Sequence, residues 1–520
     1  MPADEAKSHV EANDYIEDAH DMAKAANAVV LNPIVSHNID DNSLGFSKTE
    51  ERRCLRRLDL WLLPFILFTY ALQYTDKVIL NGASQFGIVQ DLHLYEIRGY
   101  DPRTHRPIQD LHRYSLATLI FYWGYLAGVL PAAFLAQKLP LGKFLSATVV
   151  LWGAVTMLTV TVSSYPGFMV QRFFLGVCES GVGPGFSLVI AMFWKRDEQP
   201  LRYAIWYVSN GIGAFVGPML VYGIGHIHGS LRPWKYQYLI LGGLTVIWGA
   251  LMVVVLPDNP RSARFLKDRE REVAIARIQS EQLSEENKII KVHQIVEALK
   301  DPKTWLTVVS TFCVHFVNGA CSGFGAIIVR SFGYGQLKSV LLTGCAGLYL
   351  LAILIIAGGV SSHFRNSRTY IWCLTEVPVI IGAALIWKTS WTSERSAALA
   401  GFFLLFTFAP AYTMLLSLVG SNTGGYTKKV FMMGLIWSVY CISNGVAPLF
   451  VQTTEVAEQY PSMFKGVIVT ASISLCCALA MRLYLVRENK KRDQSSNPDS
   501  GSGIAEDMTD RENAHFRYAL

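Results

Sequence analysis

The chain has 520 residues, of which 51% are hydrophobic and only 17% are charged. This composition excludes an ordinary soluble protein of the same length and is typical of a helical membrane protein. The formal net charge is +6, but Lys and Arg concentrate in alternate loops between apolar segments, so we expect a lipid bilayer, and no nucleic acid, as a partner.

Residues 1–57 form a polar, acid-rich tail without the pattern of a cleavable signal peptide. About twelve apolar segments follow, each long enough to span a bilayer as a helix. The first six are residues 58–80, 114–136, 144–162, 167–193, 203–227 and 238–256. The second six are residues 304–329, 340–360, 370–387, 397–418, 430–451 and 466–486. The sequence therefore predicts an all-α polytopic membrane protein with twelve transmembrane helices.

A polar segment at residues 258–303 separates the first six helices from the second six. We expect it to be a cytoplasmic loop between an N-terminal half, 58–257, and a C-terminal half, 304–486. The fifth span contains WYVSNGIGAFVGP and the eleventh contains WSVYCISNGVAP, which indicates two six-helix pseudo-repeats. An even number of spans places the tails at 1–57 and 487–520 on the same, cytoplasmic side. We predict the plasma membrane as the location.

The sequence contains none of the motifs of nucleotide-driven transport or of common membrane enzymes. Its 9 cysteines show no paired spacing, so we expect neither a disulfide framework nor a metal site. We also expect no enzymatic activity, no cofactor and a monomer. Energy for transport would then come from an ion gradient or from the gradient of the transported molecule.

Four ionisable residues lie inside predicted spans, where a charge costs roughly 2.5–3.5 kcal/mol and usually faces a cavity or a partner. Asp76 and Lys77 are adjacent in the first span, while Arg172 and Glu179 share one helix face of the fourth, about 10 Å apart along the axis. The predicted topology places Asp76 and Arg172 at the same depth, roughly 8–9 Å below the outer boundary, with Glu179 one step deeper. We therefore predict an anion site at Arg172 and a proton relay at Glu179.

Structural alternatives exist for these four residues. The first span could end early, which would leave Asp76 and Lys77 in solvent. Arg172 and Glu179 could instead form a purely structural pair inside the membrane.

Further polar residues extend the candidate site. Gln73 and Tyr74 continue the polar surface around Asp76 and are predicted substrate contacts. Asn318 and Asn444 could also bind substrate, although an Asn inside a membrane more often joins two helices. His315 carries less weight than these.

Gly213, Gly217 and Pro218 form a GxxxGP motif in the fifth span. The motif predicts close helix packing and a bend, and no substrate chemistry. Glu376 precedes Pro378 in the ninth span and is either a second titrating group or a partner of a helix kink.

Several motifs resemble those of the major facilitator superfamily, and within it the anion:cation symporter branch with its fungal permeases for allantoate, nicotinate and pantothenate. They are YTDK, QKLPLGK, RFFLGVCESGVGPGF, GxxxGP, LPDNP, DPKTW, SNTGGYTKK and the tail DMTDRENAHFRYAL. The resemblance implies that Asp76 and Glu179 carry coupled protons and that Arg172 binds the substrate carboxylate. Bacterial and animal members commonly have Arg where this chain has Lys77, which keeps the charge without the planar fork.

The residues and the resemblance together predict a proton-coupled symporter that takes up a small organic anion by alternating access. One alternative is an exporter of a metabolite or drug by proton antiport. Another is a nutrient receptor that binds without transport, although Asp76, Arg172 and Glu179 are all intact.

Overall fold

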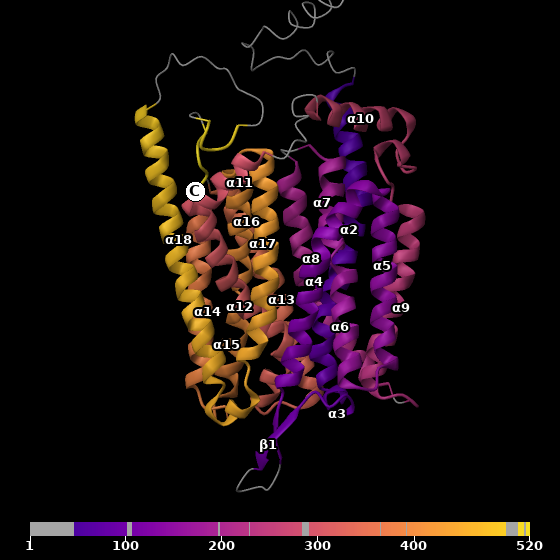
Figure 1. Cartoon of the computed structure of the whole chain (residues 1–520), viewed down its shortest axis with the longest axis vertical. Coiled ribbons are helices and arrows are strands. Elements are labelled where there is room, and N and C mark those ends of the chain that lie inside the picture. Colours follow the sequence, from indigo (N-terminus) through magenta and orange to yellow (C-terminus); the bar gives the residue numbers. More distant parts are fainter. Residues whose placement is uncertain are drawn as a thin grey trace, which may run out of the picture.

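The computed structural model describes residues 46–100, 107–195, 198–227, 229–282, 291–364, 366–391, 393–495, 508–513 and 516–520. Most of the predicted N-terminal tail, and residues 496–507 of the predicted C-terminal tail, lie outside these ranges. Within them the chain is mostly helical, and the long helices run side by side (Figure 1).

Each predicted span coincides with one helix or with two consecutive helical segments. The N-terminal half contains α2 (Lys48–Ser84), α4 (His112–Lys138), α5 (Leu141–Leu158), α6 (Tyr165–Glu179), α7 (Val182–Phe193), α8 (Gln199–Ile224) and α9 (Pro233–Val255). The C-terminal half contains α12 (Pro302–Ser331), α13 (Gln336–His363), α14 (Arg368–Lys388), α15 (Arg395–Leu405), α16 (Phe408–Asn422), α17 (Tyr426–Val446) and α18 (Pro461–Ser495). Shorter helices are α3 (Ile88–Asp91), α10 (Asp268–Gln282) and α11 (Val292–Lys300), with 3-10 turns at Thr159–Thr161, Pro260–Ser262, Ala447–Phe450 and Thr453–Glu458.

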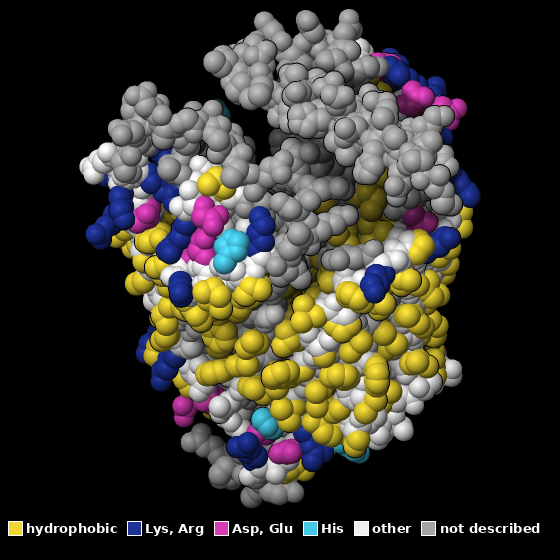
Figure 2. Space-filling model, turned by 45° about the horizontal axis from the view of Figure 1, so that its top comes forward, with side chains coloured by type: hydrophobic (Ala, Val, Ile, Leu, Met, Phe, Trp, Pro, Cys, Tyr) yellow, Lys and Arg dark blue, Asp and Glu magenta, His cyan; other side chains and the backbone are white. Residues whose placement is uncertain are grey.

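The outer surface of the bundle is suited to lipid. Among the described residues, 11 helical spans are long and apolar enough to cross a membrane. The remaining predicted span, residues 58–80 in α2, is more polar but packs along α8 within the same bundle. Leu130, Ile247 and Leu483 are 74%, 69% and 72% exposed, and Figure 2 shows hydrophobic side chains over the middle of the molecule, between charged ends. The prediction of a polytopic helical membrane protein is confirmed.

The two halves repeat one packing pattern. In the N-terminal half α2 packs on α8, α4 on α6 and α5 on α9. In the C-terminal half α12 packs on α17 and α14 on α18 in the same way, whereas both segments of the tenth span contact α14 more extensively than α13. The halves lie side by side in Figure 1 and meet where α8 contacts α13 and α17 contacts α4. This correspondence agrees with two six-helix pseudo-repeats.

Two spans are interrupted, whereas the sequence predicted one continuous helix at 167–193. The fourth span breaks between α6 and α7, and the tenth breaks between α15 and α16. Pro184 and Pro410 are each the third residue of the second segment. Proline is favoured in the first turn of a helix, and both restarts lie just before a proline. A proline does not by itself interrupt a span, since Pro218 lies inside continuous α8. The two breaks lie in equivalent spans of the two halves, which further supports an internal repeat.

A short β-hairpin lies in one loop of the helical bundle. Strands β1 (Glu96–Tyr100) and β2 (Pro107–Asp110) pair antiparallel in the loop between α3 and α4. Arg98 contacts Asp110 at 2.6 Å, and Arg113 contacts Glu96 at 3.1 Å. Arg98 and Arg113 are therefore each paired with an acid of the same loop.

Hydrogen bonds join the two halves at the end of the bundle that carries the hairpin. The Tyr114 hydroxyl donates to the Gly323 carbonyl at 2.7 Å, and the Ala326 N–H donates to Asn81 Oδ1 at 3.0 Å. Both bonds connect the N-terminal half to α12. The halves are thus closed against each other at the hairpin end.

The segment between the halves is divided between them. Helix α10 is held to the N-terminal half, where Arg57 of α2 contacts Glu270 at 2.7 Å. Helix α11 is held to the C-terminal half, where Lys428 of α17 contacts Glu297 at 2.8 Å. Each half therefore carries its own part of the linker.

Candidate functional site

The candidate site is built on α2, which begins at a capping box. The Ser47 hydroxyl accepts from the Glu50 N–H, and the Glu50 carboxylate accepts from the Ser47 N–H. Toward the other end of the helix Asp76 is buried and Lys77 is half-buried. Because α2 continues to Ser84, these charges do not lie at an early, solvated helix end.

Lys77 and Glu179 form a buried ion pair between α2 and the end of α6. Lys77 Nζ lies 3.3 Å from Glu179 Oε1, and the two side chains are 13% and 0% exposed. Gln73, one turn earlier on α2, donates to the backbone carbonyl of Glu179 at 3.4 Å. The Lys77 ammonium also lies 5.6 Å from the centre of the Tyr125 ring. Gln73 and Lys77 of α2 thus both contact Glu179, the last residue of α6.

Asp76 and Arg172 turn into the interior of the N-terminal half. Asp76 Oδ1 accepts from the Thr156 hydroxyl of α5 at 3.1 Å. Arg172 Nη2 donates to the Tyr238 hydroxyl of α9 at 3.1 Å, and its guanidinium lies 5.2 Å from the centre of the Phe168 ring. Asp76 Oδ2 and Arg172 Nε have no hydrogen-bond partner in the described part of the chain.

The four charges therefore form two layers. The charge of Arg172 acts on Asp76, in line with their predicted common depth. No ion pair within 4.0 Å joins these two among the described residues, whereas Lys77 contacts Glu179 directly. Sequence spacing missed this second contact, because the long, flexible Lys side chain reaches to a residue that lies deeper than its own backbone.

Tyr74 precedes Lys77 by three residues on α2. It lines a pocket between the halves with Asn81, Pro218, Cys321 and Phe402, among others. This pocket borders the hydrogen-bonded hairpin end rather than the Lys77–Glu179 pair.

The predicted packing motif lies where α8 crosses α2. A Cβ at Gly213 would come within 2.7 Å of the Ala71 carbonyl oxygen, and a Cβ at Gly217 would come within 3.1 Å of Val78. Only glycine permits the approach at the first position. Pro218 lies within α8 and lines the pocket between the halves.

Asn318 and Asn444 contact each other. Asn318 Nδ2 donates to Asn444 Oδ1 at 2.7 Å, and Asn444 Nδ2 donates to the Tyr440 carbonyl at 2.8 Å. The bond joins α12 to α17 within the C-terminal half. This geometry supports the alternative in which the two residues hold helices together.

His315 of α12 is buried and was a minor candidate in the sequence analysis. Its ring packs edge-on against Tyr412 at 4.1 Å and Tyr440 at 4.5 Å between ring centres. Neither ring nitrogen has a hydrogen-bond partner in the described part of the chain, nor does the Tyr412 hydroxyl. The charge of Lys77 acts on His315, so this cluster faces the ion pair from the other half. No motif marks these residues, since they are dispersed over three helices.

Glu376 lies apart from this region. Its carboxylate accepts from the Ser474 hydroxyl at 2.7 Å, and Ser474 accepts from the Trp372 indole N–H at 3.0 Å. The three residues connect α14 and α18 at the far side of the C-terminal half.

A helical membrane bundle of two repeated halves, with charged groups buried near their interface, defines the architecture of a secondary transporter. The chain matches the family model of the Major Facilitator Superfamily over residues 66–448. It belongs to this superfamily and is a membrane transporter.

Curated relatives and solved structures agree with this assignment. An uncharacterized transporter of Schizosaccharomyces pombe is 35% identical, covering 92% of this chain and 88% of the relative. The allantoate permease of Saccharomyces cerevisiae is 29% identical, covering 98% and 91%. A bacterial homolog of the lysosomal transporter Spinster, solved inward-facing, superposes with a TM-score of 0.59 at 11% identity, covering 84% of this chain and 98% of that one. The xylose transporter XylE of E. coli superposes with a TM-score of 0.58 at 13% identity, covering 82% and 97%.

Proposed function

We propose that this transporter is a proton-coupled symporter that takes up a small organic anion across the plasma membrane. The observation that carries the proposal is the buried Lys77–Glu179 ion pair, at 3.3 Å. A buried ion pair is unfavourable to form, and removal of one partner leaves an uncompensated buried charge. We therefore expect Lys77 to release Glu179 only when another anion replaces the carboxylate or when a proton neutralises it. The allantoate permease among the relatives is named for an organic anion, which is the same class of substrate.

In this mechanism the substrate carboxylate and Glu179 compete for Lys77. Protonation of Glu179 removes the charge that holds the ammonium, and Lys77 then binds the incoming carboxylate. Loss of the proton restores the Glu179 charge, which displaces the substrate. Proton and anion therefore bind together and leave together, which is the requirement for symport.

Asp76 and Arg172 have a supporting role in this mechanism. Arg172 is held by Tyr238 and is almost completely buried, so Lys77 is the better placed cation for a first contact with substrate. Asp76 retains one unpartnered carboxylate oxygen near Arg172 and is the second proton-binding group of the proposal. Arg172 then stabilises the charged form of Asp76 once its proton is released.

The C-terminal half supplies the opposite side of the site through His315 and Tyr412. A neutral imidazole carries one donor and one acceptor, and both nitrogens are buried without a partner among the described residues. We infer that these groups bind the part of the substrate that lies away from its carboxylate. If both termini are cytoplasmic, as we propose, the hairpin end, where the halves are hydrogen-bonded, is the outer end.

Uptake of labelled organic acids tests the proposal in cells that lack their own permeases. We expect one acid of a broad panel to accumulate at acidic outer pH and to stop accumulating when an uncoupler collapses the proton gradient. Efflux of the acid from loaded cells, without uptake, would favour the exporter. Saturable binding without movement in either direction would favour the receptor.

A further inference from the structure

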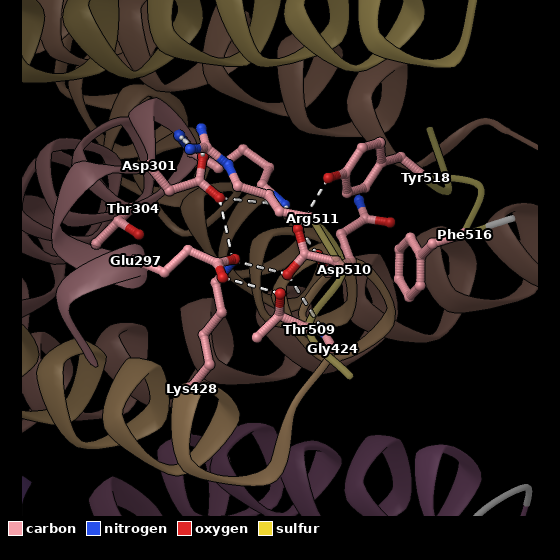
Figure 3. Close-up of polar contacts among 12 residues, drawn as sticks. Glu297, Asp301, Thr304, Gly424, Lys428, Thr509, Asp510, Arg511, Phe516 and Tyr518 are labelled. Carbon is pink, nitrogen blue, oxygen red and sulfur yellow. Dashed lines mark hydrogen bonds and ion pairs between the residues drawn. The ribbon is translucent and has the colours of Figure 1, made fainter. Parts of the chain in front are cut away.

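A second cluster of buried charges lies at the end of the C-terminal half from which α12 begins (Figure 3). Asp510 is at its centre and accepts from Lys303 Nζ at 2.5 Å and from Lys428 Nζ at 2.7 Å. The side chain of Asp510 is fully buried, and those of Lys303 and Lys428 are 10% and 2% exposed. Neither lysine nor this aspartate takes part in the proposed transport site.

Asp510 belongs to the C-terminal segment, defined as residues 508–513 and 516–520. Asn422 of α16 donates to the Ala519 carbonyl at 2.8 Å and accepts from the Ala519 N–H at 2.7 Å. Asn489 of α18 makes the same two contacts to Tyr518, each at 2.9 Å. Paired contacts to both backbone groups of a residue are how a protein surface recognises an extended peptide.

Further contacts tie the segment to the linker and to α18. Thr509 donates to Glu297 of α11 at 2.8 Å. Arg492 of α18 donates to the Asp510 carbonyl at 2.8 Å and to the Tyr518 hydroxyl at 2.9 Å. The segment thus contacts five helices, α11, α12, α16, α17 and α18.

A pocket in the C-terminal half shares residues with this contact region. Lys303 and Lys428 line it together with Thr304, Asn422 and Met432, among others. Three residues of the pocket lining, Lys303, Asn422 and Lys428, thus also contact the segment.

We propose that this end of the C-terminal half is a binding site for an extended peptide that supplies a buried aspartate, that the chain's own C-terminal segment occupies it through Asp510, and that its occupancy locks α11 to the C-terminal half. Without Asp510 the two buried lysines lose a shared counter-charge, and Thr509 no longer holds Glu297. Occupancy of this site controls how firmly α11 is held to the C-terminal half. The site is separate from the proposed binding site of the transported anion.

A cleavable version of the full chain tests the proposal. A protease recognition sequence placed between residues 496 and 507 allows the segment to be cut from the folded, purified protein. We expect the cut segment to stay bound through gel filtration in the parent protein. In Asp510→Asn we expect it to dissociate on the order of a hundredfold faster, because one partner of a buried charge group is lost. Asp493→Asn is the matched control, since Asp493 contacts Arg517 only at the surface.

A peptide with the sequence of residues 508–520 provides the second arm. Added to the cut and stripped parent protein, it should raise the midpoint of thermal unfolding, and the same peptide with Asn in place of Asp510 should not. Equal retention of the segment in the parent and Asp510→Asn proteins would overturn the proposal. An unfolding midpoint that does not change when the peptide is added would also overturn it. Neither result depends on whether the protein is a symporter.

Discussion

At the scale of residues, two sequence neighbours face two different partners. Successive helix positions are separated by about 100°, so Asp76 and Lys77 cannot face one group equally. Asp76 turns toward Thr156 and the charge of Arg172, while Lys77 reaches Glu179. The adjacent opposite charges of this helix therefore belong to two different sets of contacts, one around Arg172 and one around Glu179.

The Asn318–Asn444 bond gives a prediction that separates packing from substrate binding. A double-mutant cycle with Asn318→Ala and Asn444→Ala should give a coupling energy of about 0.6 kcal/mol in unfolding experiments, as is typical of membrane hydrogen bonds. The KM for the transported anion should not change in Asn318→Ala, because Asn318 donates to Asn444. A large rise in KM without a loss of stability would instead make it a substrate contact.

The sequence predicted that four ionisable residues lie inside the spans, but not all of their partners. Helix period and span boundaries place Asp76 level with Arg172 and keep Glu179 on the same face. The Lys77 contact and the cluster of His315 with Tyr412 depend on side-chain direction and on how the halves meet. Neither of these follows from spacing along one helix.

At the scale of elements, the spans were predictable because each is a long apolar segment, while their interruptions were not. Helices restart just before Pro184 and Pro410 in segments that hydropathy alone reads as continuous. The β-hairpin was missed because its short strands lie in a charged loop without a clear alternating pattern.

Close contact between α2 and α8 gives the prediction at this scale. Gly213→Ala should destabilise the protein by about 1–3 kcal/mol, because the new Cβ would meet the Ala71 carbonyl oxygen at 2.7 Å. Thermal unfolding of purified protein in detergent measures the effect. Gly223→Ala is the control on the same helix, since a Cβ there meets no atom within 4 Å. Equal stability of the two variants would refute tight packing at Gly213.

The C-terminal segment gives a prediction about acid. Burial alone would raise the pKa of Asp510, but Lys303 and Lys428 lower it from its ordinary 3.8 to about 2. A lowered pKa contributes stability that is present above the ordinary value and is lost as the pH falls through the folded value. A fluorophore at the segment should therefore report docking that is constant near neutral pH and lost only between about pH 4 and pH 2. Release near pH 6 would show that another group controls docking.

At the scale of the whole molecule, the linker is divided between the two halves, and the C-terminal segment is bound to the C-terminal half. Helix α10 is held by the N-terminal half, and α11 by the C-terminal half. The halves are hydrogen-bonded at the hairpin end, and the Lys77–Glu179 pair lies in α2 and α6 with the aromatic cluster of the other half opposite. We therefore expect a change at the ion pair to alter the contact between the two halves.

The most direct test of the account compares two buried carboxyl groups in reconstituted vesicles, with the anion found in the uptake screen. Glu179→Gln should abolish proton-driven accumulation and retain exchange of labelled for unlabelled anion, because Lys77 can still bind a carboxylate. Glu376→Gln, altered at a buried carboxyl far from Lys77, should accumulate the anion as the parent does. Normal proton-driven accumulation by Glu179→Gln would contradict the central claim that Glu179 couples the proton to the anion.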